Sequence, residues 1–294
     1  MTVTFPVTSP GPLLPLDAPL PQPRRYRLLD AANIADTADE RWKAGAWVNG
    51  YPAGRPAAHD PCSDGTYRLK NAEATDARPL AGSFTVVVGG VCTARSIGPS
   101  LSEYNARLRL WFEAVEGQTV EAVFADGLAG STLGAYLGDP NMEALNGGTA
   151  VTPTEGLALL EEEIARVGNG MIHVAPATAT YWVSQYLIEA GRDNQMRTRL
   201  GTLVAVGAGY IDVVPDNYGA GLPPADTEWA FASGFVQIRR SEVTMLSNDY
   251  AQSLDRSSNE VTVYAERDYL LTWVGRQDTG DDNHIQAGVL IDRI

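Results

Sequence analysis

The sequence predicts an α+β fold in which one long helix carries sets of antiparallel strands. Three features lead to this prediction: a proline-rich start, a helical periodicity over residues 99–126, and strand-forming runs over 229–240 and 260–274. The chain has 294 residues, of which 44% are hydrophobic and 20% are charged, the composition of an ordinary globular protein. This length can hold one large domain or two smaller ones.

Charge and cysteine content narrow the class of protein. A net charge of −14 argues against broad affinity for nucleic acid, although an anionic wall can enclose DNA without holding it. We find neither a secretory signal nor an apolar run of the roughly 20 residues that span a membrane, so we expect folding in the cytoplasm. Cys62 and Cys92 are the only cysteines, which favours two separate thiols over a disulfide.

The first 29 residues form a proline-rich arm that ends in a basic cluster. Because proline fixes φ and removes a backbone donor, we expect an extended or polyproline II conformation. A terminus of this kind is ordered only when something holds it, and a neighbouring subunit is the leading candidate. The prolines are Pro6, Pro10, Pro12, Pro15, Pro19, Pro21 and Pro23, and the basic residues are Arg24, Arg25 and Arg27.

The sequence after the arm predicts first a short helix and then a series of strands. Residues 30–43 predict a short polar helix. Within residues 44–96, the stretches AWVNGY, GTYRLK and SFTVVVGGVCTA predict strands between Gly, Pro, Asp and Asn residues. We expect this range to form an extended β excursion rather than a self-contained core.

Residues 99–126 carry the strongest periodic signal, and Pro99 with Ser100 provides a helix start. The helix should be roughly 40 Å long, which suits a spine on which other elements pack. Gly117 in its middle costs about 1 kcal/mol relative to Ala and indicates a bend or close packing. The expected apolar stripe consists of Leu101, Tyr104, Leu108, Phe112, Val115, Thr119 and Val123.

A compact α/β unit follows a glycine-rich connection over residues 127–151. Thr152, Pro153 and Glu155 match a capping box with proline at the first helical position, and Gly168 provides the stop. The sequence then predicts a strand at 171–175, a helix at 177–190, a strand at 200–214 and a loop at 215–227.

The C-terminal third predicts two long strands, 229–240 and 260–274, that face each other across a polar loop. Apolar residues alternate in the second strand, and Arg267 interrupts the alternation. The alternating residues are Val261, Val263, Ala265, Tyr269, Leu271 and Trp273.

No residue pattern indicates catalysis, and we expect no catalytic, cofactor-binding or metal-binding residues. His173 lies in an apolar strand, far in sequence from His59 and His284, so a hydrogen-bonded core histidine is expected. Gly207-Ala208-Gly209 predicts a tight turn rather than a dinucleotide site, and no nucleophile elbow, zinc-protease or Walker motif is present. Two acidic groups are interpreted as a solvated turn (Asp278, Asp281, Asp282 and Asn283) and a solvated helix face (Glu161, Glu162 and Glu163).

The order of arm, β excursion, long helix, α/β unit and terminal strands resembles the Hong Kong 97 fold of tailed-phage major capsid proteins. The segment WFEAVEGQTVEAVFADG, with Glu116 and Glu121, is similar to capsid proteins of phages that infect actinobacteria. The segments GMIHVAP, RLGTLVAVGAGY, WAFASGFVQIRRSEV and VYAERDYLLTW fit the same family. The resemblance covers nearly the whole chain and rests on packing patterns, not on catalytic signatures.

The resemblance implies a structural protein that assembles into hexamers and pentamers of an icosahedral head around double-stranded DNA. It implies a virion location with assembly in the host cytoplasm, no cofactor, no membrane and no sequence-specific DNA binding. The implied divisions are an arm at 1–39, an E-loop region at 40–96, a peripheral domain at 97–150 with 230–294, and an axial domain at 151–229.

Partners implied by the resemblance are further copies of the chain and, beside them, portal, scaffold and decoration proteins. The chain begins with Met1 and contains no coiled-coil candidate, so a separate scaffold or none is expected. Some relatives cross-link through lysine and asparagine, but with only two lysines we expect a non-covalent shell. Our candidates for contacts between subunits are Pro12, Pro15, Arg24, Arg25, Arg27 and Lys70.

Three alternatives remain open on the sequence. The same fold builds encapsulins, which are cellular compartments that hold cargo enzymes. A phage tail or neck protein would form rings or tubes instead of closed shells. A monomeric hydrolase with an unrecognised site is the most distant alternative.

Overall fold

The computed structural model describes Pro19 and residues 22–36, 40–47, 80–93, 101–128, 136–168, 170–191, 193, 195–219, 221–245, 254–255, 260–273 and 286–293. These residues form two main sheets and a small two-stranded sheet, β2-β3. Sheet 1 has the order β1-β11-β14-β12, with β4 and β13 also paired to β14. Sheet 2 has the order β5-β15-β10-β6-β9-β8-β7.

The helical elements are α1 (Leu28–Ala31), η1 (Glu40–Ala44), α2 (Leu101–Asp126), η2 (Leu145–Gly148), α3 (Pro153–Val167), α4 (Pro176–Ser184), η3 (Ala208–Tyr210) and η4 (Asp216–Tyr218). The strands are β1 (Asn33–Asp36), β2 (Ala46–Trp47), β3 (Leu80–Ala81), β4 (Ser83–Thr93), β5 (Glu143–Ala144), β6 (Met171–Val174), β7 (Ile188–Ala190), β8 (Met196–Thr198), β9 (Leu203–Val206), β10 (Thr227–Ser233), β11 (Val236–Arg240), β12 (Thr244–Met245), β13 (Leu254–Asp255), β14 (Glu260–Trp273) and β15 (Gln286–Asp292).

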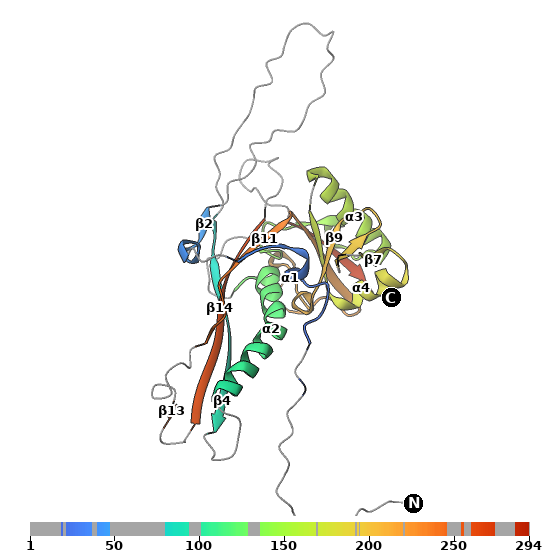
Figure 1. The fold of residues 1–294 in the computed structure, drawn as a ribbon. Helices are drawn as coiled ribbons and strands as arrows, with labels where there is room; N and C mark the ends of the chain where they lie inside the picture. The colour runs from blue at the N-terminus through green and yellow to red at the C-terminus, as the bar shows by residue number, and fades with distance from the viewer. Residues whose placement is uncertain are drawn as a thin grey trace, which may run out of the picture.

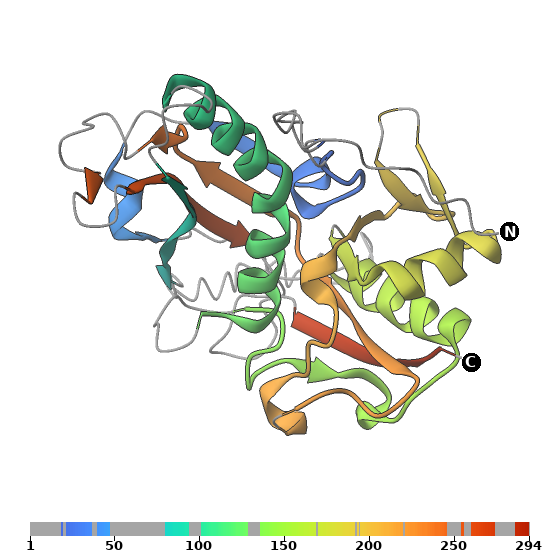
Figure 2. The same ribbon diagram turned by 90° about the horizontal axis from the view of Figure 1, so that it is seen from below.

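The long helix α2 is confirmed, with 26 residues, and it lies between the part of the molecule that contains β14 and the part that contains α3 and α4 (Figure 2). Its buried row differs from the expected stripe, because Thr119 is exposed and Val115 and Val123 are only half-buried. A residue at every fourth position makes the buried row instead: Leu108, Phe112, Glu116, Val120 and Phe124. Glu116 belongs to this row, and Glu121, which follows Val120, is buried as well.

The central strands of sheet 2, β15, β10 and β6, are buried on both faces. Helices α3 and α4 cover one face around Leu160 and Trp182, and the other face joins the core beneath α2. This position explains why β6 and β10 are buried at every residue, as the continuous apolar run MIHVA predicted.

Helix α3 begins and ends where the capping signals predicted. The Thr152 hydroxyl accepts a hydrogen bond from the Glu155 backbone N–H at 3.3 Å, and Gly168 ends the helix at φ 93° in the left-handed region. One expectation for this helix is wrong: Glu163 is buried and bonded to Arg166 at 3.1 Å, so the three glutamates are not all a solvated face.

Strand β4 confirms the last of the strands expected within residues 44–96, and its partner is β14; residues 48–79 of the expected excursion lie outside the described residues. The two strands pair antiparallel from Ser83 to Thr93 against Glu260 to Leu270, and Figure 1 shows this ribbon beside α2, away from α3 and α4. Val263, Ala265, Tyr269, Leu271 and Trp273 are buried as the alternation predicted, but Leu270 between them is buried as well. Arg267 does not interrupt the alternation, because its side chain is buried on the same face.

Four predicted elements are corrected by the structure. Residues 30–43 are not one helix, because Asn33–Asp36 forms β1 and pairs in parallel with β11. Helix 177–190 ends at Ser184, after which Tyr186 takes a left-handed φ of 58° and β7 begins. Strand 200–214 is confined to Leu203–Val206 and is followed by the turn η3. Residues 229–240 form two strands, β10 in sheet 2 and β11 in sheet 1.

Sheet 2 also crosses the implied domain boundaries, since it combines β5 and β15 with the strands of residues 151–229. The four-range division therefore stays a prediction. Several sequence expectations lie outside the described residues: the strand GTYRLK, the acidic group at 278–283, His59, His284 and Cys62. The Cys92 side chain lies outside them as well.

Candidate functional site: the root of the N-terminal arm

The candidate contact residues of the arm fall into three groups. Pro12, Pro15 and Lys70 lie outside the described residues. Arg24 and Arg25 are exposed. Arg27, in contrast, begins the segment that enters the protein, and its side chain is only 15% exposed. The structure therefore places the end of the arm, residues 26–31, inside its own subunit; we call this segment the arm root.

The arm root is held first by local contacts of Arg27. Its backbone N–H donates to the Asp30 carboxylate at 3.0 Å, and its Nε lies 3.4 Å from the same oxygen. The guanidinium also lies on α2 at Gly117, where an added Cβ would be only 3.0 Å from Nη1. The predicted close packing at Gly117 is thus confirmed, and its partner is the arm root.

Glu121 ties the arm root to two other elements. Its Oε1 accepts the Leu28 backbone N–H at 3.2 Å, and its Oε2 accepts the Gly209 backbone N–H at 3.3 Å. The residue is 1% exposed, and burial raises the pKa of its carboxyl to about 7, against the two hydrogen bonds that lower it. One carboxylate therefore joins α1, α2 and η3.

The turn at residues 207–210 fits against Glu121 because it contains glycine. A Cβ on Gly209 would lie 2.5 Å from the Glu121 Cβ and 2.6 Å from the Gln118 carbonyl oxygen. The predicted tight turn is confirmed. The backbone just before the turn also binds the arm root, because the Val206 N–H donates to the Tyr26 carbonyl at 2.7 Å. Tyr26 itself has a left-handed φ of 67°.

A second carboxylate, Glu116, joins α2 to sheet 1. Arg267 Nη1 lies 2.9 Å from each Glu116 oxygen, and the Tyr269 hydroxyl donates to Oε2. Burial raises the pKa of Glu116, while Tyr269 and Arg267 lower it, and the pKa of Tyr269 is raised by its own burial and by this carboxylate. The Arg267 guanidinium also lies over the Phe112 ring, 5.8 Å from its centroid.

His173 is the hydrogen-bonded core histidine that the sequence predicted. Its Nδ1 lies 3.1 Å from the Tyr210 hydroxyl and its Nε2 lies 2.7 Å from the Ser233 hydroxyl. Complete burial lowers its pKa to about 3, so the ring is neutral at neutral pH. It therefore links η3 to β6 and β10.

These groups join elements that lie far apart in the sequence. Within the described part of the chain, no three His, Cys, Asp or Glu side chains converge on a point that could hold a metal ion. None of the described helices is long and apolar enough to cross a bilayer.

The sequence pointed to Glu116 and Glu121 because the segment that contains them is similar to capsid proteins. It did not predict that the two side chains are buried. The signal for Glu116 was present, since it lies midway between Phe112 and Val120 in a row of fourth positions. Its partner Arg267 is 151 residues away, and the backbone donors to Glu121 are 93 and 88 residues away. Such partners are decided by tertiary structure.

The similarities of this chain to known proteins are structural. No family model and no curated protein sequence matches the chain. The capsid of an empty GTA particle is similar with 12% identity and a TM-score of 0.52, covering 97% of this chain and 95% of that chain. The capsid of cyanophage Pam1 is similar with 10% identity and a TM-score of 0.51, covering 99% and 98%. The SrpI encapsulin of Synechococcus elongatus PCC 7942 is matched at 11% identity and a TM-score of 0.49, covering 96% and 92%.

The chain has the fold of Hong Kong 97-type capsid subunits over nearly its whole length. The α+β prediction and the resemblance to that fold are both confirmed. At this level of identity the likeness establishes the fold.

Proposed function

We propose that this chain is the major structural protein of a tailed-phage head. Copies assemble into hexamers and pentamers of a closed icosahedral shell around double-stranded DNA, so the protein acts in the virion and not as an enzyme. The observation that carries this proposal is the end-to-end likeness to phage-type capsids, with 97% of this chain and 95% of the GTA capsid chain aligned. A likeness over nearly the full length of both chains supports a shared way of assembling.

Exposed apolar side chains on the β4–α2 side support contacts between copies. Val87 on β4 is 51% exposed, and Leu110 and Trp111 on α2 are 49% and 45% exposed. A neighbouring subunit would cover exposed apolar side chains of this size, and we propose that role for these three.

The arm adds a second set of contacts. Arg24 and Arg25 are exposed, and the chain as a whole is acidic, with 36 Asp and Glu residues against 22 Lys and Arg residues. We propose that these two arginines pair with acidic side chains of a neighbour, and that Pro12, Pro15 and Lys70 also lie in contacts between copies. Arg27 contributes by fixing the arm root. The net charge of −14 supports a wall that encloses DNA without sequence-specific binding.

Expression of the chain, with the scaffold gene of its genome where one exists, tests the proposal. We expect fast-sedimenting particles that micrographs show as closed shells, and nuclease-protected DNA in particles taken from an infected host. Monomers or open tubes would contradict a shell role. Closed shells that hold a cargo enzyme in place of DNA would identify the encapsulin alternative.

A further inference from the structure

The junction at Glu121 connects the arm to the rest of the subunit. Leu28 is fully buried, and its N–H reaches Glu121 Oε1, while Glu121 Oε2 binds the N–H of Gly209. After the root, β1 pairs in parallel with β11 at the edge of sheet 1. Before the root, Arg24 and Arg25 are exposed. The arm therefore leaves the subunit within a few residues of Leu28, which is bound to the buried carboxylate of Glu121.

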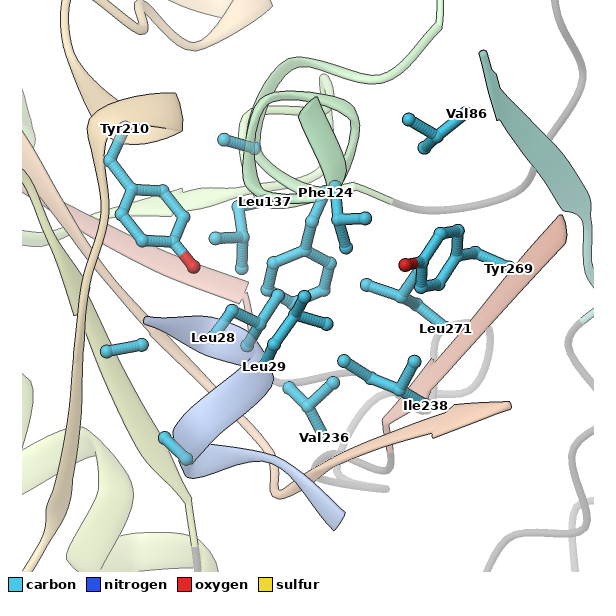
Figure 3. Packing of buried hydrophobic residues seen from close by; sticks show 14 of the residues in the cluster. Leu28, Leu29, Val86, Phe124, Leu137, Tyr210, Val236, Ile238, Tyr269 and Leu271 are labelled. Atoms are coloured by element: carbon cyan, nitrogen blue, oxygen red, sulfur yellow. The ribbon is translucent and has the colours of Figure 1, made fainter. Parts of the chain in front are cut away.

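The apolar core closes around this junction. Leu28 and Leu29 pack among Phe124 of α2, Tyr210 of η3 and Leu271 of β14 in one cluster (Figure 3). The contacts give the arm root a docked position, and undocking would remove the Leu28 N–H from Glu121 and open that side of the carboxyl to water. Docking of the root and the environment of Glu121 are therefore coupled.

Few charges are available to balance Glu121. Arg27 and Asp30 of α1 act on it with opposite signs, and Tyr210 of η3 faces it with a hydroxyl that His173 of β6 binds. Neither Arg27 nor any other described cation is within hydrogen-bond distance of the carboxylate, so its contacts are the two backbone donors. A carboxyl that is buried without a neighbouring cation is protonated to a higher pH than the same carboxyl in water.

We propose that Glu121 is a proton-dependent latch, which holds the arm root docked when its carboxyl is neutral and favours release of the root when the carboxyl is ionised. The sign follows from linkage. The docked carboxyl has its pKa raised to about 7 from an ordinary 4.5, so docking takes up a proton between these values and weakens as the pH rises through 7. The full shift corresponds to a change of up to about 300-fold in the docking equilibrium.

In a shell, a released root would loosen the arm that we place across a neighbour. This consequence rests on the proposed function, whereas the latch itself is a property of the single chain. Its test is therefore made on the purified chain and does not depend on whether shells form.

Trypsin cleavage after Arg27 reports on the latch, because Arg27 is sequestered in the docked root. Arg24 and Arg25 are exposed trypsin sites, so both are replaced by glutamine in every protein and in the reference peptide of this assay. The cleavage rate is divided by that of a synthetic peptide of residues 22–36 at the same pH, which cancels the pH dependence of trypsin. We expect this ratio to rise at least tenfold from pH 5.5 to pH 8.5 in the wild type. In Glu121→Gln, which cannot ionise, the ratio should not change with pH.

Two controls separate the latch from general unfolding. Glu113→Gln removes an exposed carboxylate from the same helix and should follow the wild type. Cleavage after the buried Arg267 reports global unfolding and should stay far slower than cleavage after Arg27 at every pH in this range. If Glu121→Gln does not fold, hydrogen exchange at the Leu28 N–H of the wild type, corrected for intrinsic rates, should show the same rise. A flat wild-type ratio, or an equal rise in Glu121→Gln, would overturn the latch.

Discussion

Buried titratable side chains give this protein a specific pH response. Complete burial lowers the pKa of His173 from 6.5 to about 3, so the folded protein keeps the ring neutral while the unfolded chain binds a proton. The stabilisation from this residue is complete above pH 6.5 and is lost as the pH falls toward 3, by up to about 5 kcal/mol. Glu121 acts in the opposite direction, since its raised pKa makes the fold less stable as the pH rises from 4.5 to 7.

We predict that His173→Gln removes the loss of stability below pH 6.5. Urea unfolding of wild type and variant at several pH values from 4 to 7 measures it, and the free-energy difference between them should shrink steadily as the pH falls. Two parallel stability curves would show that His173 does not titrate in the way its burial implies.

We expect the free energy of unfolding to depend strongly on keeping both partners of the buried Glu116–Arg267 pair. Arg267→Met leaves a buried carboxylate without its cation and should lower the free energy of unfolding by about 3–5 kcal/mol. The double variant Glu116→Gln/Arg267→Met should lose less, because no isolated charge remains. Arg109→Met breaks an exposed pair on the same helix and should cost about 0.5 kcal/mol or less in the same denaturant titration. Equal losses for Arg267 and Arg109 would contradict this account.

Among the elements, the contact of η3 with α2 depends on the absence of a side chain at Gly209. In Gly209→Ala the new Cβ would lie 2.6 Å from the Gln118 carbonyl oxygen, so the turn must move away from the helix, at a cost of about 1–3 kcal/mol or more. Gly168→Ala meets no atom within 4 Å and should cost only about 1 kcal/mol for its left-handed backbone. Thermal unfolding should rank the two variants in this order, and a reversed order would contradict the packing at η3.

Elements with a strong local signal could be predicted from the sequence, and those defined by distant partners could not. Helix α3 has its cap and its stop within its own sequence, and β4 contains the β-branched, apolar run Val86–Val88. Strand β1 has no such signal, because its parallel partner β11 lies about 200 residues further along the chain. The inward turn of Glu116 and Glu121 was missed for the same reason, since their partners come from β14, α1 and η3.

For the whole molecule, the structure separates the arm into a root that belongs to the subunit and an outer part that we place on a neighbour. Deletion of residues 2–23 removes only residues ahead of the root, so the circular dichroism and thermal unfolding of the subunit should stay unchanged. We expect shells of the truncated chain to dissociate at a lower denaturant concentration than wild-type shells in light-scattering measurements. Unchanged assembly and shell stability would show that the arm makes no contribution between subunits.

The fold class follows from the order of elements, and the likeness to capsid chains confirms it over 97% of the sequence. Electron cryo-microscopy of the assembled chain tests the central claim most directly. The account predicts closed icosahedral shells of hexamers and pentamers in which the density of each subunit contains α2 beside the β4–β14 ribbon. Monomers, rings or open tubes as the only products would contradict it.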